Sequence, residues 1–526
     1  MTTTGETSAI SKALDGLIIF SLFLFAAAAP HSIAVTQGAW LLGGLGWILR
    51  LVVPPRQRMV RTPLDYFLLG FFILSGLTAI LSYEPVVSIG KMRAASLFTI
   101  IYLVAENVRS LKVARALALT LVASCMINVF YTAATRVIGK GVKIEQVKAD
   151  SPLAAATMTS AKRLPSPFPV ISGDTVLTVD GNAVRSANDL ALFLTSSKEH
   201  PEATVIIYRG DEFPPLHVPR GHLLPGSTPE EQLGIGSWSI GRDWRAKGFY
   251  GHYVSYAEAL QLIASLAFGL FLTYPIKKNR ISLFLLMAFA GLVFALMLTV
   301  TRASWLALLV SATVMLLLGT SRRVILIAFA CAIPLVITAA FVLQQKRHVG
   351  LIDQQDASIT WRQTVWREGF DLLKSKPRHL LIGVGMDSIK AHWREWGLFD
   401  QGRIPIGHMH SNLLEIALER GVPALLLWLA LLAAYARMLF QTFRKLKVRE
   451  IDNQSNWLDP WVDRGIILGA LGGLCGFFVS GIVHYNWGDS EVIMIFYFLM
   501  GLSLVVARGG EDMSSKSSIR SPTKSR

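Results

Sequence analysis

The chain has 526 residues, of which 52% are hydrophobic and only 16% carry a charge. The apolar residues come in long blocks with short basic or turn-rich breaks between them, so we interpret the chain as a polytopic membrane protein. Many of the Lys and Arg residues behind the net charge of +16 lie in those breaks, where they orient the chain in a membrane, which argues against nucleic acid as a partner. The three cysteines lie inside apolar blocks and offer neither a disulfide framework nor the spacing of metal ligands.

About twelve apolar segments are predicted to be transmembrane helices, because most are long enough to cross a hydrocarbon layer of ~30 Å. The predicted spans are residues 13–30, 33–53, 64–82, 93–107, 113–134, 252–274, 281–300, 303–319, 323–343, 422–440, 464–483 and 490–507. The first block, residues 13–30, also resembles a signal peptide. Its removal would leave the direction of the second span unchanged.

Alternate breaks between these spans carry the positive charge and are therefore predicted to be cytoplasmic. Both termini then lie inside. Two long polar segments, residues 135–250 and 344–421, lie outside, together with Arg302 and the last hairpin, residues 484–489. The chemistry of such a protein is expected in its long outer segments.

The first outer segment is predicted to form a small mixed α/β domain. Residues 141–147, 173–181 and 203–210 have the pattern of strands, and Ser186 caps a helix over residues 187–194. The pieces Ser-Pro-Leu-Ala, Gly-Asp-Thr-Val-Leu-Thr-Val-Asp-Gly and Val-Arg-Ser-Ala-Asn-Asp-Leu, in this order, resemble a PDZ domain of the bacterial envelope type.

This resemblance implies that the insert captures a peptide by strand addition, with the terminal carboxylate held by backbone N–H groups of a Gly-containing loop. The matching residues here are Ile138, Gly139 and Gly141. The alternative is a rigid spacer that has the fold without a ligand, since fold alone does not establish function.

A histidine pair in the second outer segment, His408 and His410, runs into a short amphipathic helix that Gly421 is predicted to end. Ser411 or Asn412 can cap this helix. The positive end of the helix dipole disfavours an imidazolium, so a neutral His410 that can accept a proton is expected. The alternative is an interfacial histidine that only packs. Nothing else in the sequence completes a metal-ligand set around the pair.

Three further outer stretches stand beside this one: the basic entry to a span at residues 245–257, Arg302 at the mouth of another span, and residues 361–370 leading to a Gly-Val-Gly turn. Each also has an ordinary structural explanation, as a loop charge, a snorkelling arginine or an aromatic belt with a tight turn. In this order, however, the four stretches resemble the O-antigen ligase and polymerase superfamily, polytopic enzymes that move glycans from undecaprenyl diphosphate on the outer face of the bacterial inner membrane.

By this resemblance Arg245 and Arg302 hold the lipid-linked diphosphate, and His410 is the essential histidine of the large outer loop. The residue after this histidine is often Asn in the family, whereas Ser411 stands here and Asn412 follows, so His408 could share or replace the role. The weaker candidates for the same pocket are His252, Arg362 and Arg367.

The implied chemistry agrees with these residue types. Guanidinium groups stabilise the charge of a leaving diphosphate, and a neutral histidine removes the proton of the incoming hydroxyl. Direct attack inverts the anomeric centre and requires no cofactor, and no metal where arginines supply the positive charge.

The expected fold is an all-α polytopic membrane protein with a PDZ-like extracytoplasmic insert, located in the bacterial inner membrane with its active site on the periplasmic face. The predicted parts are spans 1 to 5 (1–135), the PDZ-like domain (136–222), a loop with spans 6 to 9 (223–343), the large periplasmic catalytic loop (344–421), spans 10 to 12 (422–510) and a cytoplasmic tail (511–526).

The predicted function is ligation of a glycan from undecaprenyl diphosphate to an acceptor such as lipopolysaccharide core. A polysaccharide polymerase and a protein O-glycan ligase use the same donor and stay open as alternatives. From other classes, a scaffold that recruits an envelope partner through the PDZ-like domain and a transporter also stay open. A transporter is disfavoured because the polar groups gather on one outer face instead of the midplane.

Overall fold

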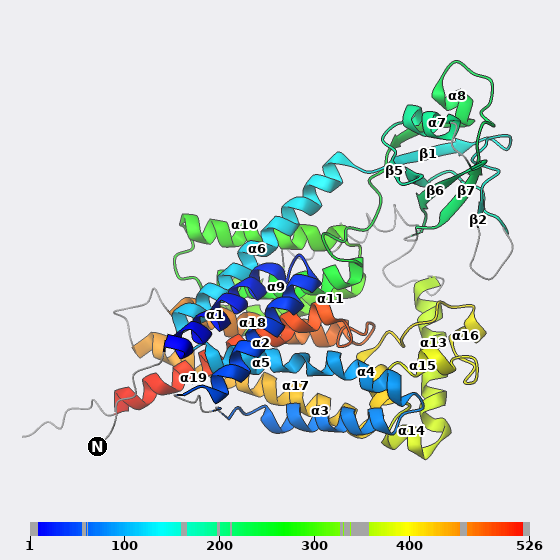
Figure 1. Ribbon diagram of the computed structural model, residues 1–526. Coiled ribbons are helices and arrows are strands. Elements are labelled where there is room, and N and C mark those ends of the chain that lie inside the picture. Colours follow the sequence, from blue (N-terminus) through cyan, green and yellow to red (C-terminus); the bar gives the residue numbers. More distant parts are fainter. Residues whose placement is uncertain are drawn as a thin grey trace, which may run out of the picture. The chain divides into compact units, whose positions relative to one another are not determined.

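The computed structural model of the protein describes residues 9–54, 59, 61–158, 166–196, 200–210, 213–326, 330, 337, 357–452 and 460–518. The chain divides into two compact units. The helical unit contains Met1–Val129 and Lys247–Arg526, and the insert unit contains Phe130–Ala246. Figure 1 shows the helices of the first unit and the small sheet of the second.

Ten of the described helices are long and apolar enough to cross a membrane, which makes the chain a multi-pass membrane protein. They are α1 (Ala9–Ala28), α2 (Ile33–Val52), α4 with α5 (Pro85–Ala95 and Thr99–Asn107), α6 (Leu111–Ile138), α9 (Tyr253–Thr273), α10 (Arg280–Leu298), α11 (Arg302–Gly319), α17 (Asn412–Asp452), α18 (Pro460–Ser480) and α19 (Ser490–Ser518). A shorter apolar helix, α3 (Asp65–Ile80), stands beside them.

The predicted spans agree with these helices except at three places. The span expected at 64–82 is the 16-residue helix α3, which is shorter than the ten candidate spans. The span expected at 93–107 begins earlier, at Pro85. The sequence prediction missed its first turns because Lys91 and Arg93 interrupt the apolar pattern there. The span expected at 323–343 lies largely outside the described residues. The total of about twelve therefore stays a prediction.

Three helices, α9, α18 and α19, form the centre of the helical unit. Between 83 and 89% of each span is buried, against 28–44% for the other long helices. Glycines allow α9 and α18 to approach closely: a Cβ atom added at Gly269 would lie 2.5 Å from the carbonyl oxygen of Gly465. Small residues at helix contacts are typical of membrane proteins, where van der Waals packing drives association.

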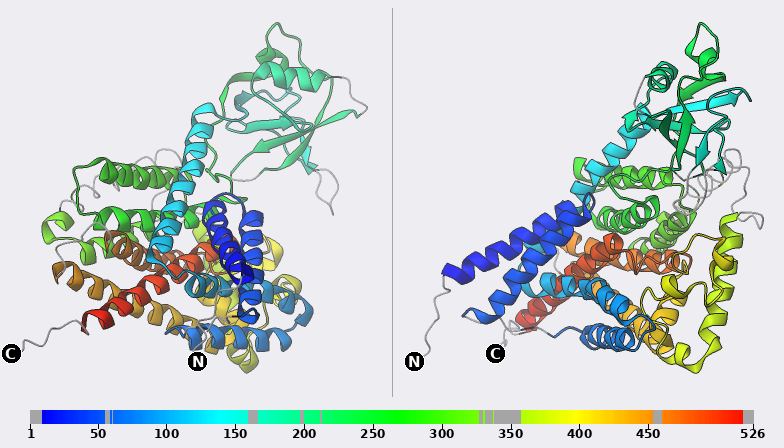
Figure 2. Two further views of the ribbon diagram at one scale, coloured as in Figure 1. Left: turned by 60° about the vertical axis from the view of Figure 1, so that its left-hand side comes forward. Right: turned by 45° about the vertical axis from the view of Figure 1, so that its right-hand side comes forward.

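Four helices gather at one end of this bundle, as Figures 1 and 2 show. They are α13 (Ala357–Ser375), α14 (Pro377–Leu381), α15 (Ile389–His392) and α16 (Phe399–Gly402). Together with the first turns of α17 they enclose a small apolar core of their own that includes Val365, Met409 and Leu418. The remainder of the predicted catalytic loop, residues 344–356, lies outside the described residues.

Gly421 interrupts α17 with φ +83°, so the short helix that begins at Asn412 ends there, as predicted. A side chain at this position would meet the backbone of α14, because an added Cβ would clash with the carbonyl oxygen of Leu381. Pro423 then opens the long apolar part of α17.

The insert unit contains an antiparallel sheet in the order β3-β2-β7-β6-β4-β1-β8, with β5 paired to β4. Its strands are β1 (Val142–Val147), β2 (Thr157–Met158), β3 (Ser166–Pro167), β4 (Thr175–Val179), β5 (Asn182–Ala183), β6 (Glu202–Tyr208), β7 (Pro215–Pro219) and β8 (Ile235–Ile240). Ser186 caps α7 (Ala187–Thr195) as predicted. The helix α8 (Pro229–Leu233) and β8 extend the unit past the predicted boundary at 222.

Candidate active site

A cavity of about 580 Å³ lies in the helical unit at the end where α13 to α16 gather. Its walls come from Phe71 of α3, from α4, α13, the first turns of α9 and α19, and from residues 386–390, 408–420 and 484–490. A cavity of this volume is large enough to hold a small ligand such as one or two sugar rings. Three segments that are far apart in the sequence therefore line one cavity: residues 408–410, residues 361–362 and the last hairpin, residues 484–489.

His408 and His410 lie side by side in this cavity, with ring centroids 4.1 Å apart. The backbone N–H of His410 donates to Nδ1 of His408 at 3.2 Å, so this nitrogen of His408 bears a lone pair. Trp361 meets the His410 ring edge-on at 4.6 Å, and Arg362 lies over Trp361 at 4.8 Å. The predicted catalytic histidine is thus packed between an aromatic ring and a second histidine, with a guanidinium group nearby.

Met409 explains why both histidines point into the cavity. Its side chain is fully buried in the small core. Its N–H donates to Glu415 Oε2 at 2.5 Å, and its carbonyl accepts from Trp366 Nε1 at 2.9 Å. With the residue between them held on three sides, the flanking histidines are directed to the open side.

His410 has φ +49°, in the left-handed region that a non-glycine residue rarely occupies. A conformation of this kind costs on the order of 1–3 kcal/mol and is kept where the surrounding structure imposes it. The strain is located at the residue with the strongest catalytic prediction.

Both histidines are neutral across the physiological range. Burial lowers the pKa of His408 to about 4 and that of His410 to about 2, and for His410 the neighbouring His408 and Arg362 add to the effect. The prediction of a neutral His410 followed from the helix dipole, whereas the larger cause here is loss of water.

Asn412 joins the histidine stretch to the last hairpin. Its backbone N–H donates to the carbonyl of Gly481 at 2.7 Å, its side-chain NH₂ donates to Asn486 Oδ1 at 2.6 Å, and its Oδ1 accepts from the N–H of Trp487 at 3.0 Å. These three bonds fix the hairpin beside the start of α17.

A buried histidine–carboxylate pair lies on the hairpin side of the cavity. His484 Nδ1 is 2.8 Å from Glu258 Oε1 of α9, and Ser480 Oγ donates to the same oxygen at 2.9 Å. Beside this pair, Asp489 accepts from Ser255, and burial raises the pKa of Asp489 to about 6. The hairpin and α9 therefore bring two carboxylates, Glu258 and Asp489, to the cavity.

Cationic groups also line the cavity. Lys91 and Lys390 bracket Asp387 at 2.9 and 2.7 Å. The hydrogen bonds and charges of the two lysines lower the pKa of Asp387 although its burial acts in the opposite direction. Two ammonium groups around one carboxylate leave a net positive charge for an anionic ligand.

Arg420 adds a buried guanidinium group. Its Nη1 donates to Glu419 Oε2 at 2.9 Å, and the Tyr485 hydroxyl donates to the same oxygen at 3.1 Å. Glu419 Oε1 accepts from the N–H of Asp387 at 2.9 Å, so the hairpin, α17 and the lysine pair form one network. Burial, with the charge of Glu419 next, raises the pKa of Tyr485, so its phenol stays protonated.

Not every predicted site residue lines this cavity. His408, His410, His252 and Arg362 do. His252 also caps α9, where its Nδ1 accepts from the N–H of Val254 at 3.2 Å. Arg302 begins α11 and Arg367 lies on α13, and neither is among the described residues that line the cavity.

Arg245 and the predicted peptide-binding residues belong to the insert unit. Ile138 ends α6, and Gly139 and Gly141 have φ +83° and +73°, as a tight loop requires. This loop leads into β1, both edges of which are paired: β4 occupies one edge and the chain's own β8 the other. The N–H of Lys140 also donates to the carbonyl of Gly241 at 2.9 Å.

The polar groups of the cavity that sequence reasoning missed include Lys91, Glu258, Lys390, Arg420 and His484. Two of them had a signal in the sequence. Glu258 is an acidic residue inside an apolar span, which marks a functional site by default, and Lys91 interrupts another span. For His484 the sequence predicted only a position outside the membrane, in the hairpin of residues 484–489, and no role in the site.

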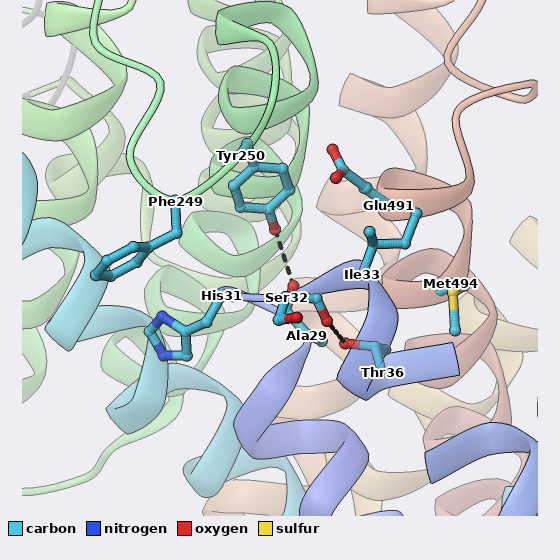
Figure 3. Close-up of a pocket in the computed structure, with 9 residues that line it drawn as sticks. All are labelled: Ala29, His31, Ser32, Ile33, Thr36, Phe249, Tyr250, Glu491 and Met494. Atoms are coloured by element: carbon cyan, nitrogen blue, oxygen red, sulfur yellow. Dashed lines mark hydrogen bonds between the residues drawn. The ribbon is translucent and has the colours of Figure 1, made fainter. Parts of the chain in front are cut away.

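A second cavity, of about 10 Å³, lies between α1, α2 and α19 (Figure 3). The Tyr250 hydroxyl points to the carbonyl of Ala29, to which it donates at 3.1 Å, and Thr36 donates to the carbonyl of Ser32 at 2.7 Å. The space is about that of one water molecule, so it holds no substrate.

Residues 286–429 match the profile of the family described as O-Antigen ligase. The matched segment includes Arg302, Arg362 and both histidines of the cavity, whereas Glu258 and His484 lie outside it. No curated protein sequence matches the chain.

Proposed function

We propose that the protein transfers a glycan from undecaprenyl diphosphate to an acceptor hydroxyl outside the cytoplasm, because residues 286–429 match the O-antigen ligase family. The observation that carries this proposal is the cavity of about 580 Å³, in which two neutral histidines share one space with four cationic side chains. These cations are Lys91, Arg362, Lys390 and Arg420.

The donor diphosphate binds to these cationic groups. A leaving diphosphate gains negative charge as the bond from the sugar C1 to its oxygen breaks, and fixed cations in a water-poor site stabilise that charge. Arg420 is only 6% exposed, whereas the side chains of Lys91 and Lys390 are nearly half exposed, so the lysines lie where a membrane-bound donor can reach them.

His410 acts as the general base. It takes the proton of the acceptor hydroxyl while the acceptor oxygen attacks C1 and the diphosphate leaves with the bonding electrons, which inverts the anomeric centre. Nearby positive charge adds to burial in lowering the pKa of His410. A bound diphosphate supplies the opposite charge, so donor binding raises the proton affinity of His410 when it is needed.

Arg245 and Arg302 stay candidates for donor contacts on the strength of the sequence resemblance. Arg302 lies in the matched segment at the first position of α11. A role for either arginine requires that the donor extends past the cavity of about 580 Å³.

Among the alternatives, a transporter has the least support, because most residues that line the cavity belong to the first turns of α9 and α19 and to loops. Substrate sites of transporters lie near the middle of the membrane. A scaffold function would not explain why neutral histidines and four cationic side chains line one cavity.

The acceptor defines the three enzymatic alternatives. We favour a ligase that transfers to lipopolysaccharide core, with a polymerase and a protein O-glycan ligase as the other acceptor classes. Purified protein is given undecaprenyl-diphosphate glycan together with one acceptor at a time: lipopolysaccharide core, a second donor molecule, or a Ser/Thr peptide. Glycan on lipopolysaccharide supports the ligase, glycan on a second donor the polymerase, and glycan on the peptide the protein ligase. Absence of transfer with all three refutes the proposed function.

A further inference from the structure

The buried pair of His484 and Glu258 has the build of a proton acceptor with its orienting carboxylate. Both residues line the cavity, and their exposed fractions are only 7 and 3%. The two atoms in contact, His484 Nδ1 and Glu258 Oε1, are 2.8 Å apart. A carboxylate can only accept, so Nδ1 bears the hydrogen and the lone pair of the neutral ring is on Nε2.

The cavity reaches this lone pair. In the described part of the chain His484 Nε2 has no hydrogen-bond partner, and it is also not among the unpaired atoms that are sealed from solvent. A histidine with a carboxylate on one nitrogen and an open lone pair on the other is arranged to take a proton, because the carboxylate stabilises the imidazolium that results.

His410 is built differently, although it shares the cavity. Its ring neighbours are Trp361 and His408, and within the described residues no ion pair to a carboxylate holds it. Asn412, two residues further on, fixes the hairpin that carries His484, so the two histidines are on parts of the unit held together by hydrogen bonds. His484 interacts electrostatically with both His408 and His410, and the titratable residues His252 and Asp489 line the same cavity.

We propose that His484, oriented by Glu258, is a second proton-accepting residue of the transfer reaction, an inference that rests on the proposed function. The proton of the acceptor hydroxyl goes first to His410 and then through cavity water to Nε2 of His484. The new bond from the acceptor oxygen to C1 forms as the bond from C1 to the diphosphate oxygen breaks, and Glu258 offsets the charge of the imidazolium. His484 returns to the neutral form by releasing the proton to solvent.

Two substitutions of His484 test this role. Asn in place of His484 keeps a donor near Glu258 but removes the accepting nitrogen, and Ala leaves room for a free imidazole. We expect His484→Asn to lower the transfer rate by about 100-fold. We also expect added imidazole to restore His484→Ala, with a restored rate that rises with the basicity of substituted imidazoles. A merely structural histidine would not show this dependence.

His392 offers a matched control, because its Nε2 pairs with Glu84 at 3.0 Å in another histidine–glutamate pair that is not among the cavity-lining residues described. His392→Asn is expected to keep the wild-type rate. Transfer by His484→Asn within about threefold of the wild type, or a folded His484→Ala protein without rescue by imidazole, overturns the inference while the proposed function stands. Absence of transfer by the wild-type protein overturns both.

Discussion

The side-chain NH₂ of Asn412 donates a hydrogen bond of 2.6 Å to Oδ1 of Asn486. Both side chains are essentially without solvent exposure, at 0 and 1%. The bond joins the start of α17, which follows His410, to the hairpin that carries His484. The geometry of the candidate active site therefore depends on a residue that does not itself line the cavity.

Substitution of Asn412 by Ala removes two buried side-chain hydrogen bonds, each with a net contribution of about 1 kcal/mol, and leaves their partners unsatisfied at a further cost of about 1 kcal/mol. We expect a loss of about 3 kcal/mol in the free energy of unfolding, with transfer activity strongly reduced. Asn279→Ala is the control, since Asn279 caps α10 and its loss costs about 1 kcal/mol. Equal thermal shifts for the two purified variants would contradict this structural role.

Substitution of His410 by Gly is expected to separate stability from activity. Glycine adopts φ +49° without steric cost, so relief of strain offsets part of the lost packing and the unfolding temperature stays near that of the wild type. Transfer activity is lost. His410→Val provides the contrast, because a β-branched residue tolerates this conformation poorly and should unfold at a lower temperature. A Gly variant less stable than the Val variant would disprove the strain argument.

Lys390 is expected to hold the donor diphosphate. We predict that Lys390→Met raises the KM for the lipid-diphosphate donor about tenfold, while the KM for the acceptor stays the same, because one charge-assisted contact is lost. Lys374→Met, an exposed change on α13 away from the cavity, serves as the control. Steady-state kinetics with each substrate varied in turn gives both constants; an unchanged donor KM would remove Lys390 from the site.

The low pKa values of His408 and His410 predict a pH-dependent stability. Below pH ~6.5 the unfolded chain protonates these histidines, but the folded protein keeps His408 neutral down to about 4 and His410 neutral to about 2. Stability therefore falls as pH decreases from ~6.5 towards 4, by at most about 1.4 kcal/mol per pH unit for each histidine. Comparison with a His408→Asn/His410→Asn double variant cancels the opposite contribution of Asp489, whose pKa is raised. Parallel stability curves for the two proteins would show that the histidines are not buried as described.

The position of β8 predicts that the insert does not pair with an external peptide along β1 while β8 is in place. Proline at Ser237 and Ser239 removes N–H groups from β8, which is expected to loosen the strand and expose the edge of β1. Full-length wild-type and double-proline proteins are compared on an array of peptides with free and amidated C-termini. Binding by the wild type at the strength of the variant would show that β8 does not block the edge.

The sequence predicted well those features that depend on a local pattern of residues. Long apolar blocks predicted nearly all described spans, and the Ser186 cap and the Gly421 helix end were both identified from local patterns. These features depend on neighbouring residues alone, so they are readable without the fold.

The cavity was less predictable because its walls come from segments hundreds of residues apart. Glu258 and His484 pair across 226 positions, and Asp387 gains Lys91 as a partner from a span whose first turns looked too polar to be one. The strand β8 was missed since it lies beyond the part of the insert that resembles a PDZ domain, and its role depends on pairing with β1.

The catalytic role of His410 is tested most directly by glycan transfer from undecaprenyl diphosphate with three purified proteins: wild type, His410→Ala and His408→Ala. With His410 as general base, we expect transfer by the wild type and a rate lower by about 10²- to 10⁴-fold in His410→Ala, with a smaller loss in His408→Ala. Gel filtration and thermal unfolding establish that the variants are folded. Transfer by a folded His410→Ala protein at the wild-type rate would contradict the assignment of His410 as the general base.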